Sequence, residues 1–183
     1  ILVVVCSLVG MSPTSVLAAG ATYYVNKTVA CSDSGPGTIG SPYCSIGKGA
    51  SMAYAGDTVQ VAAGSYAETV VPPRSGSSGL PITFSAALGV SVTGASGSSA
   101  FEITGRSYIT INGFTVNNTA EHGIYAINSN NITISNNQIS QLSGGYGIFL
   151  DHVSASTVSG NVSHHNLDGI HLYSSSNVMV RDN

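Results

Sequence analysis

The sequence is poor in charged residues, and poorest in positive ones. Only 7% of its 183 residues are charged, with five lysines and arginines against eight aspartates and glutamates, and the formal net charge is −3. The basic residues are scattered along the chain: Lys27, Lys48, Arg74, Arg106 and Arg181. Nucleic-acid binding needs a clustered basic surface. A nucleic-acid partner is therefore not expected.

The sequence also lacks a long apolar run. Ser12-Pro13-Thr14-Ser15 interrupts the apolar start, so no 18 consecutive apolar residues remain for a membrane-spanning helix. Ile1 to Val5, followed by the small residues around Ala18-Ala19-Gly20, indicate a secretory signal peptide over residues 1–20 whose basic start is missing. A buried strand is the alternative. We expect a secreted, cell-surface or periplasmic protein and, from the missing initiator Met and the interrupted last repeat, a fragment.

Cysteine is scarce, with three in the chain. Cys6 falls inside the expected signal peptide. Cys31 and Cys44 flank a loop rich in Gly, Ser and Pro, and in an exported protein such a pair predicts a disulfide. Two free buried thiols are the alternative.

The chain does contain a repeat. Gly123-Ile124, Gly147-Ile148 and Gly169-Ile170 each begin an apolar alternation and are spaced 24 and 22 residues apart, and Ala100-Phe101 fits the same frame. A second alternation follows at a fixed offset, as in Ile132-Thr133-Ile134. Two short strands per copy at this period predict a solenoid of parallel strands. An asparagine recurs in each copy and is interpreted as an inward hydrogen-bonded ladder: Asn137, Asn161 and Asn183.

The segment before the repeat is expected to cap the solenoid. Ser45 to Ala55 is its one helix candidate, with Ser45 as N-cap. Alternating residues predict strands at Thr22–Val25, Thr58–Ala62, Glu68–Val71, Ile82–Ala86 and Val90–Thr93. The expected class is all-β, with a signal peptide (1–20), a cap with irregular first coils (21–99) and regular coils (100–183), the last cut off.

Two stretches resemble the pectate-lyase-like superfamily of right-handed parallel β-helix proteins. One is the opening segment that contains Tyr23-Tyr24-Val25, Ser32 to Thr38 and Gly56-Asp57-Thr58-Val59. The other is the Gly-Ile-x-Leu and Asn repeat from Gly123 to Asn183. The resemblance implies a right-handed β-helix that is secreted and monomeric and acts on a uronate-containing polysaccharide. It also implies calcium as the cofactor, if there is one.

Strand alternation separates inward from outward residues in each copy. The first outward column is Glu102, Tyr125, Phe149 and His171, and the second is Thr104, Ile127, Asp151 and Tyr173. We call these eight residues the outward strip. Aromatic rings offer flat faces to sugars, while a carboxylate and an imidazole move protons. Stacking that only stabilises the solenoid is the structural alternative.

The reaction is less well defined than the surface. Lyases of this fold usually take the proton next to a uronate carboxylate with a Lys or Arg base, but no Lys follows Lys48. We assign catalysis to Asp151, His171 and Tyr173, and substrate binding to Tyr125, Phe149, His152 and Asp168. The alternatives are a non-catalytic glycan-binding, adhesin or periplasmic accessory protein, a uronate epimerase, and a glycoside hydrolase that uses the carboxylates of Asp151 and Asp168.

Metal ligands are not defined by the sequence. A cluster of His152, Asp168 and His171 is one candidate, but no tight spacing such as His-Glu-x-x-His supports zinc. Calcium needs several oxygen ligands. The acidic residues are too scattered to form an evident cage, so the metal site stays unassigned.

Overall fold

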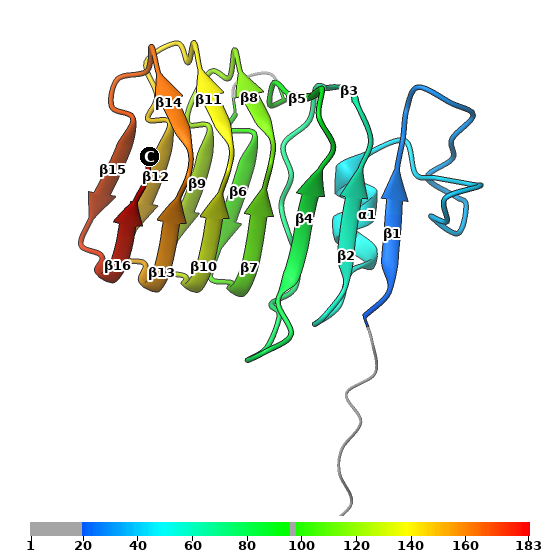
Figure 1. Cartoon of the computed structure of the whole chain (residues 1–183), viewed down its shortest axis with the longest axis horizontal. Helices are drawn as coiled ribbons and strands as arrows, with labels where there is room; N and C mark the ends of the chain where they lie inside the picture. Colours follow the sequence, from blue (N-terminus) through cyan, green and yellow to red (C-terminus); the bar gives the residue numbers. More distant parts are fainter. Residues whose placement is uncertain (1–19, 96–97) are drawn as a thin grey trace, which may run out of the picture.

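The protein is a parallel β-solenoid of about five turns, seen in a computed structural model that describes residues 20–95 and 98–183 (Figure 1). The signal peptide expected at residues 1–20 lies outside the described residues, apart from Gly20. Every strand pairing between the named strands is parallel, as the repeat predicts. From β2 onward, strands that are consecutive in the sequence belong to different sheets.

Three sheets form the walls of the solenoid. The seven-stranded sheet contains β1 (Thr22–Val25), β2 (Thr58–Val61), β4 (Ile82–Ala86), β7 (Ser107–Asn112), β10 (Asn130–Ser135), β13 (Ser154–Ser159) and β16 (Ser176–Arg181). The five-stranded sheet contains β3 (Gly64–Tyr66), β5 (Val90–Val92), β8 (Thr115–Asn117), β11 (Gln138–Ser140) and β14 (Val162–His164). The four-stranded sheet contains β6 (Phe101–Thr104), β9 (Ile124–Ile127), β12 (Ile148–Asp151) and β15 (Ile170–Tyr173).

Two strand predictions are corrected. The regular coils have three strands rather than two, except the last, which contains β15 and β16. The third strand was missed because its three residues include a single inward one, such as Val116 or Ile139, and are too few to show an alternation. The strand expected at Glu68–Val71 is also wrong. Only Val70 forms a bridge there, to Phe101, and the following Pro72-Pro73 cannot extend a ladder because proline has no N–H.

The repeat glycines allow the coils to stack closely. A Cβ on Gly147 would lie 2.0 Å from Ser163 Oγ and 2.5 Å from the Gly169 carbonyl oxygen. A Cβ on Gly123 would similarly lie 2.5 Å from the Gly147 carbonyl oxygen. Gly123 and Gly147 are therefore required by the close approach of the next coil's backbone.

The core is a continuous apolar column inside the three walls, with one polar ladder. Asn161 Oδ1 accepts from both the backbone N–H (3.0 Å) and Nδ2 (2.9 Å) of Asn137, and Asn183 Oδ1 does the same for Asn161. Asn137 Oδ1 in turn accepts from the backbone N–H of Phe114, whose ring packs edge-on against Phe101 at 4.9 Å. The predicted asparagine ladder is confirmed.

Helix α1 (Ile46–Met52) covers the inner side of β1 and β2 (Figure 1). Ser45 is its N-cap, as predicted, but the helix ends three residues earlier than Ala55. The Glu68 carboxylate accepts from the backbone N–H groups of Ile46 and Gly47 at 2.9 and 2.8 Å. Gly49 lies so near the core that a Cβ would come 2.6 Å from Val59. The glycine that lowers helix propensity is thus needed for packing.

The loop before the helix is held by a disulfide between Cys31 and Cys44, whose Cα atoms are 5.1 Å apart. Asp33 lies inside this loop and accepts hydrogen bonds from the N–H of Cys44 (2.8 Å) and the hydroxyl of Ser45 (2.8 Å). The disulfide and this carboxylate together hold the loop against the start of α1.

Candidate functional site

The strand register builds the outward strip on the four-stranded sheet. Across β6, β9, β12 and β15 the first column pairs in the order Glu102, Tyr125, Phe149, His171. The second column pairs in the order Thr104, Ile127, Asp151, Tyr173. Stacked strands are about 4.8 Å apart. The side chains therefore form two continuous ladders, as the alternation predicts.

A third column borders the strip, as the shared position before the repeat glycines predicts. It consists of the residues just before the repeat glycines: His122, Tyr146 and Asp168. The Gly123 N–H donates to the Tyr146 carbonyl, and the Gly147 N–H donates to the Asp168 carbonyl, so these positions stack. Only Asp168 was predicted to bind substrate. His122 and Tyr146 share its position in the sequence pattern, but no role was predicted for them.

The rings of the first and third columns form two face-to-face stacks. Tyr146 lies between two imidazoles, with ring centroids 5.3 Å from His122 and 4.3 Å from His171 and interplanar angles of 8° and 14°. Tyr125 and Phe149 form the second stack at 5.2 Å and 15°. Phe149 meets His122 and His171 edge-on, at 5.0 and 5.3 Å. Stacked and edge-on geometries are the favourable ones for aromatic rings. The five rings therefore form one wall.

His171 ends this wall and is oriented by Asp168. Its Nδ1 lies 3.0 Å from Asp168 Oδ2. An ionised carboxylate only accepts hydrogen bonds, so Nδ1 carries the hydrogen and Nε2 keeps a lone pair. The two side chains are 34% and 54% exposed, respectively. This arrangement leaves an oriented imidazole that can accept a proton from a bound molecule.

His122 has the opposite arrangement. Its Nδ1 accepts the backbone N–H of Tyr146 at 3.1 Å, which requires an unprotonated Nδ1. Burial lowers the pKa of His122 below its ordinary value, the neighbouring Glu121 opposes the shift, and His171 adds to it. The two histidines on either side of Tyr146 therefore differ: Nδ1 of His122 accepts a backbone hydrogen bond, whereas Nδ1 of His171 faces a carboxylate.

Carboxylates surround the other end of the wall. Burial raises the pKa of the Tyr125 phenol above its ordinary value, and the negative charges of Asp151, Glu102 and Glu121 raise it further. Asp151 is 18% exposed and contacts His152 Nδ1 at 2.5 Å, and the imidazole of His152 meets the Tyr173 ring edge-on at 6.0 Å. The predicted residues thus form two carboxylate–imidazole pairs, Asp151–His152 and Asp168–His171.

The described residues do not form a metal site. Within 20–95 and 98–183, no three His, Cys, Asp or Glu side chains converge, so the candidate cluster of His152, Asp168 and His171 is not assembled. His152 is paired with Asp151 instead. A calcium ion takes six to eight oxygen ligands. The carboxylates of the strip are spread over the coils and partly committed to imidazoles, and do not fit that requirement.

A hollow of about 240 Å³ lies away from the strip, near the start of the solenoid. Tyr24, Ile39, Pro42 and Ala87 are among the residues that line it, and it shares none with the three columns. The strip is by contrast a surface that runs along the coils, a shape suited to an extended polymer.

Known proteins resemble the chain in fold. The profile of the family described as "Pel9A-like, right handed beta helix region" matches residues 23–177. No curated protein sequence matches. The solved structures include a rhamnogalacturonan lyase, with a TM-score of 0.58, 18% identity, and coverage of 83% of this chain and 50% of that one.

Two further solved structures have higher TM-scores. An alginate lyase from Paenibacillus sp. str. FPU-7 has a TM-score of 0.66 and 18% identity, and the match covers 88% of this chain and 58% of the lyase chain. The GH136 lacto-N-biosidase from Eubacterium ramulus has a TM-score of 0.70 and 15% identity, and the match covers 89% of this chain and 41% of the biosidase chain. The chain thus spans about half the length of these structures, which at such identities share its fold.

Proposed function

Because the chain belongs to the family of Pel9A-like right-handed β-helix regions, we propose that its outward strip binds a polysaccharide and cleaves it by β-elimination. The supporting observation is the Asp168–His171 pair, which ends a wall of aromatic rings. The family and the fold are compatible with several reactions, so the proposal rests on this site. Tyr125 and Phe149 are stacked on each other, and the exposed side of this stack offers an apolar surface to sugars.

His171 is the base in this proposal. Its Nε2 takes the proton from the sugar carbon next to the carboxyl group (C5). The electron pair forms the C4=C5 double bond, and the bond from C4 to the glycosidic oxygen breaks. Asp168 holds the imidazole in the required tautomer and stabilises the imidazolium that results.

Tyr173 gives a proton to the leaving oxygen. It lies two residues from His171 on the same face of β15, about 7 Å along the strand, a separation comparable to one sugar ring. Asp151 and His152 lie beside Tyr173 and bind the hydroxyl groups of the neighbouring sugar. No step uses a metal ion, since the described residues do not fit one.

Export and a monomeric state belong to the same proposal. The apolar start of the chain and the Cys31–Cys44 disulfide support an oxidising compartment outside the cytosol. Among the described residues, no helix reaches the length and apolarity of a membrane span.

The test is to incubate the protein with pectin, galacturonan, alginate and rhamnogalacturonan and to follow the ultraviolet absorbance of unsaturated ends. We expect unsaturated product from at least one, and a rate lower by about 10²–10⁴-fold in His171→Ala. Asp168→Asn, which keeps the shape but not the charge, is expected to lose most of that rate. His165→Ala removes an exposed imidazole beyond β14 and serves as the matched control.

Each alternative has its own outcome. Reducing ends without unsaturation would replace β-elimination by hydrolysis, with Asp151 and Asp168 as the carboxylate pair. Affinity that depends on Tyr125 and Phe149, without any product, would make the strip a binding surface. Unsaturated product that is formed equally fast by His171→Ala would remove His171 as the base.

A further inference from the structure

We infer that the strip selects uronate units whose carboxyl groups are uncharged, as in methyl-esterified galacturonan, over free uronates. This inference rests on the proposed function and specifies its substrate class. Its basis is the charge around the aromatic wall: carboxylates lie at both ends, and the lysines and arginines make their contacts with other parts of the structure.

Carboxylates lie on both sides of the wall. Asp168 contacts His171 at one end. At the other end Glu102, Glu121 and Asp151 are close enough to act together on the Tyr125 hydroxyl. A sugar in contact with Tyr125 or Phe149 therefore lies close to these carboxylates. Like charges placed close together in a partly desolvated site repel one another. A free uronate there would add another negative charge.

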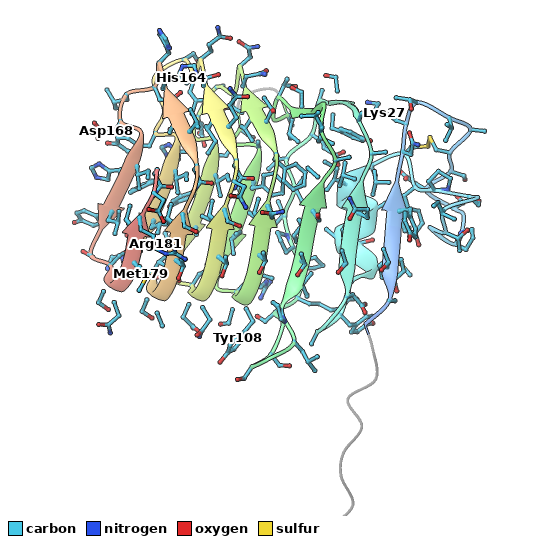
Figure 2. All side chains as sticks on the ribbon, in the orientation of Figure 1. Lys27, Tyr108, His164, Asp168, Met179 and Arg181 are labelled. Carbon is cyan, nitrogen blue, oxygen red and sulfur yellow. A yellow bond between two sulfur atoms is a disulfide. The ribbon has the colours of Figure 1, made fainter. Side chains whose placement is uncertain are left out.

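The five basic side chains of the protein are engaged elsewhere. Lys27 and Lys48 lie over the rings of Tyr66 and Tyr43 near the start of the solenoid. Arg181 is on β16 in the seven-stranded sheet and contacts Asp182. Figure 2 shows Lys27 and Asp168 toward opposite ends of the molecule. No cation from these residues offsets the strip.

The two remaining arginines support the cap and the first coils. Arg74 donates to the Ser51 carbonyl oxygen at 2.6 Å and lies over the Tyr54 ring. Arg106 donates from Nε to the Pro72 carbonyl oxygen at 3.2 Å. Both guanidinium groups are therefore tied to backbone oxygens of the first coils.

His122 does not supply the missing positive charge. Its Nδ1 accepts the Tyr146 N–H, and protonation of that nitrogen would place two donors against each other. His171 has to be neutral to act as the base. The described residues also form no cage for a calcium ion that could bridge to a free carboxylate.

A methyl ester removes both the repulsion by the carboxylates and the need for a compensating cation. It carries no charge, so the carboxylates of the strip no longer repel the substrate, and its methyl group can pack on the rings. An uncharged ester also makes the C5 proton easier to remove, because the resulting carbanion does not sit beside an existing negative charge. His171 takes that proton, the C4=C5 bond forms, and the glycosidic oxygen leaves with a proton from Tyr173.

The experiment compares galacturonans of equal length with high and low methyl esterification, at low salt and with a chelator. We expect kcat/KM to favour the esterified chain by about 10-fold or more, as three charges about 10 Å away in water would give. The preference is expected to shrink as salt shortens the screening length. The double variant Glu102→Gln, Glu121→Gln is expected to improve the de-esterified chain selectively. Asp182→Asn, which removes one carboxylate just beyond β16, is the control for a charge change outside the strip.

Binding is measured separately on His171→Ala, so that selectivity and catalysis can fail independently. If His171→Ala binds the esterified chain more tightly but the wild type forms no product from either polymer, β-elimination is contradicted and the selectivity stands. Equal or faster cleavage of the de-esterified chain in the presence of chelator would overturn the selectivity and keep the reaction. Cleavage that depends on added calcium would overturn the selectivity as well.

Discussion

The four-stranded and seven-stranded sheets carry equally regular columns of side chains but different chemistry. In the seven-stranded sheet a single column pairs threonine with threonine through six strands: Thr22, Thr58, Thr83, Thr110, Thr133 and Thr157. At the equivalent spacing the four-stranded sheet presents Glu102, Tyr125, Phe149 and His171. The backbone geometry is shared, so the difference lies in the side chains alone.

The comparison separates residues that are favoured in any strand from residues whose side chains contact one another. Threonine is β-branched and favoured in any strand, and no hydrogen bond joins the hydroxyls of these six to another described residue. The rings and carboxylates around the strip are instead linked in pairs, within a coil as between Asp168 and His171 and across coils as between Tyr125 and Phe149. Substitutions can test whether these links serve stability alone or also a bound molecule.

The largest effect on stability is expected from a substitution that pushes two neighbouring coils apart. Gly147→Ala would place its Cβ against Ser163 Oγ and the Gly169 carbonyl oxygen. We expect a loss of about 3 kcal/mol or more in the free energy of unfolding, measured by urea denaturation, because backbone of the next coil would have to move. Gly40→Ala is the control, since nothing lies within 4 Å of its Cβ. Equal stability of the two variants would show that the close stacking is not needed.

A smaller effect is expected when one ring is removed. Phe149→Ala deletes the ring that contacts Tyr125, His122 and His171. Aromatic pairs contribute about 0.5–1.5 kcal/mol each beyond buried area, and we expect a total loss of about 1–3 kcal/mol. Thr133→Val on the threonine column is expected to change stability by less than about 0.5 kcal/mol. Similar losses for both would erase the distinction between the two faces.

The smallest effect is a difference in pH dependence. The folded-state pKa of His122 lies below its ordinary value, so the unfolded chain takes up the proton first as the pH falls. Its contribution to stability is therefore complete above about pH 6.5 and lost progressively below it. The fall in melting temperature between about pH 7.5 and about pH 5.5 should be smaller in His122→Gln than in the wild type. Identical falls would contradict the neutral, hydrogen-bonded state of His122.

Much of the fold could be predicted because the repeat specifies it. The Gly-Ile frame correctly separated Ile148 and Leu150, which are buried, from Phe149 and Asp151, which face outward. The third strand could not be predicted, since a single buried Val116 between two polar residues has no period. The proline pair after Val71 was a sufficient reason to reject a strand there, and it was overlooked.

The site was only partly predictable. Alternation placed Tyr125, Phe149 and His171 in one column, and the structure agrees. The pairing of Asp168 with His171 and the stacking of Tyr146 between two imidazoles cross from one column to another. Such contacts depend on how long side chains lean between coils, and strand periodicity carries no information about that direction.

The asparagine ladder also determines where the chain can change in length. Successive ladder residues are 24 and 22 residues apart, as are the repeat glycines, and the difference falls between each asparagine and the next glycine. The step is ten residues from Asn137 to Gly147 and eight from Asn161 to Gly169, and the residue before each of these glycines is Tyr146 or Asp168. Insertions and deletions in evolution can therefore alter the border of the strip while every core contact keeps its partner, so substrate preference can diverge without redesign of the scaffold.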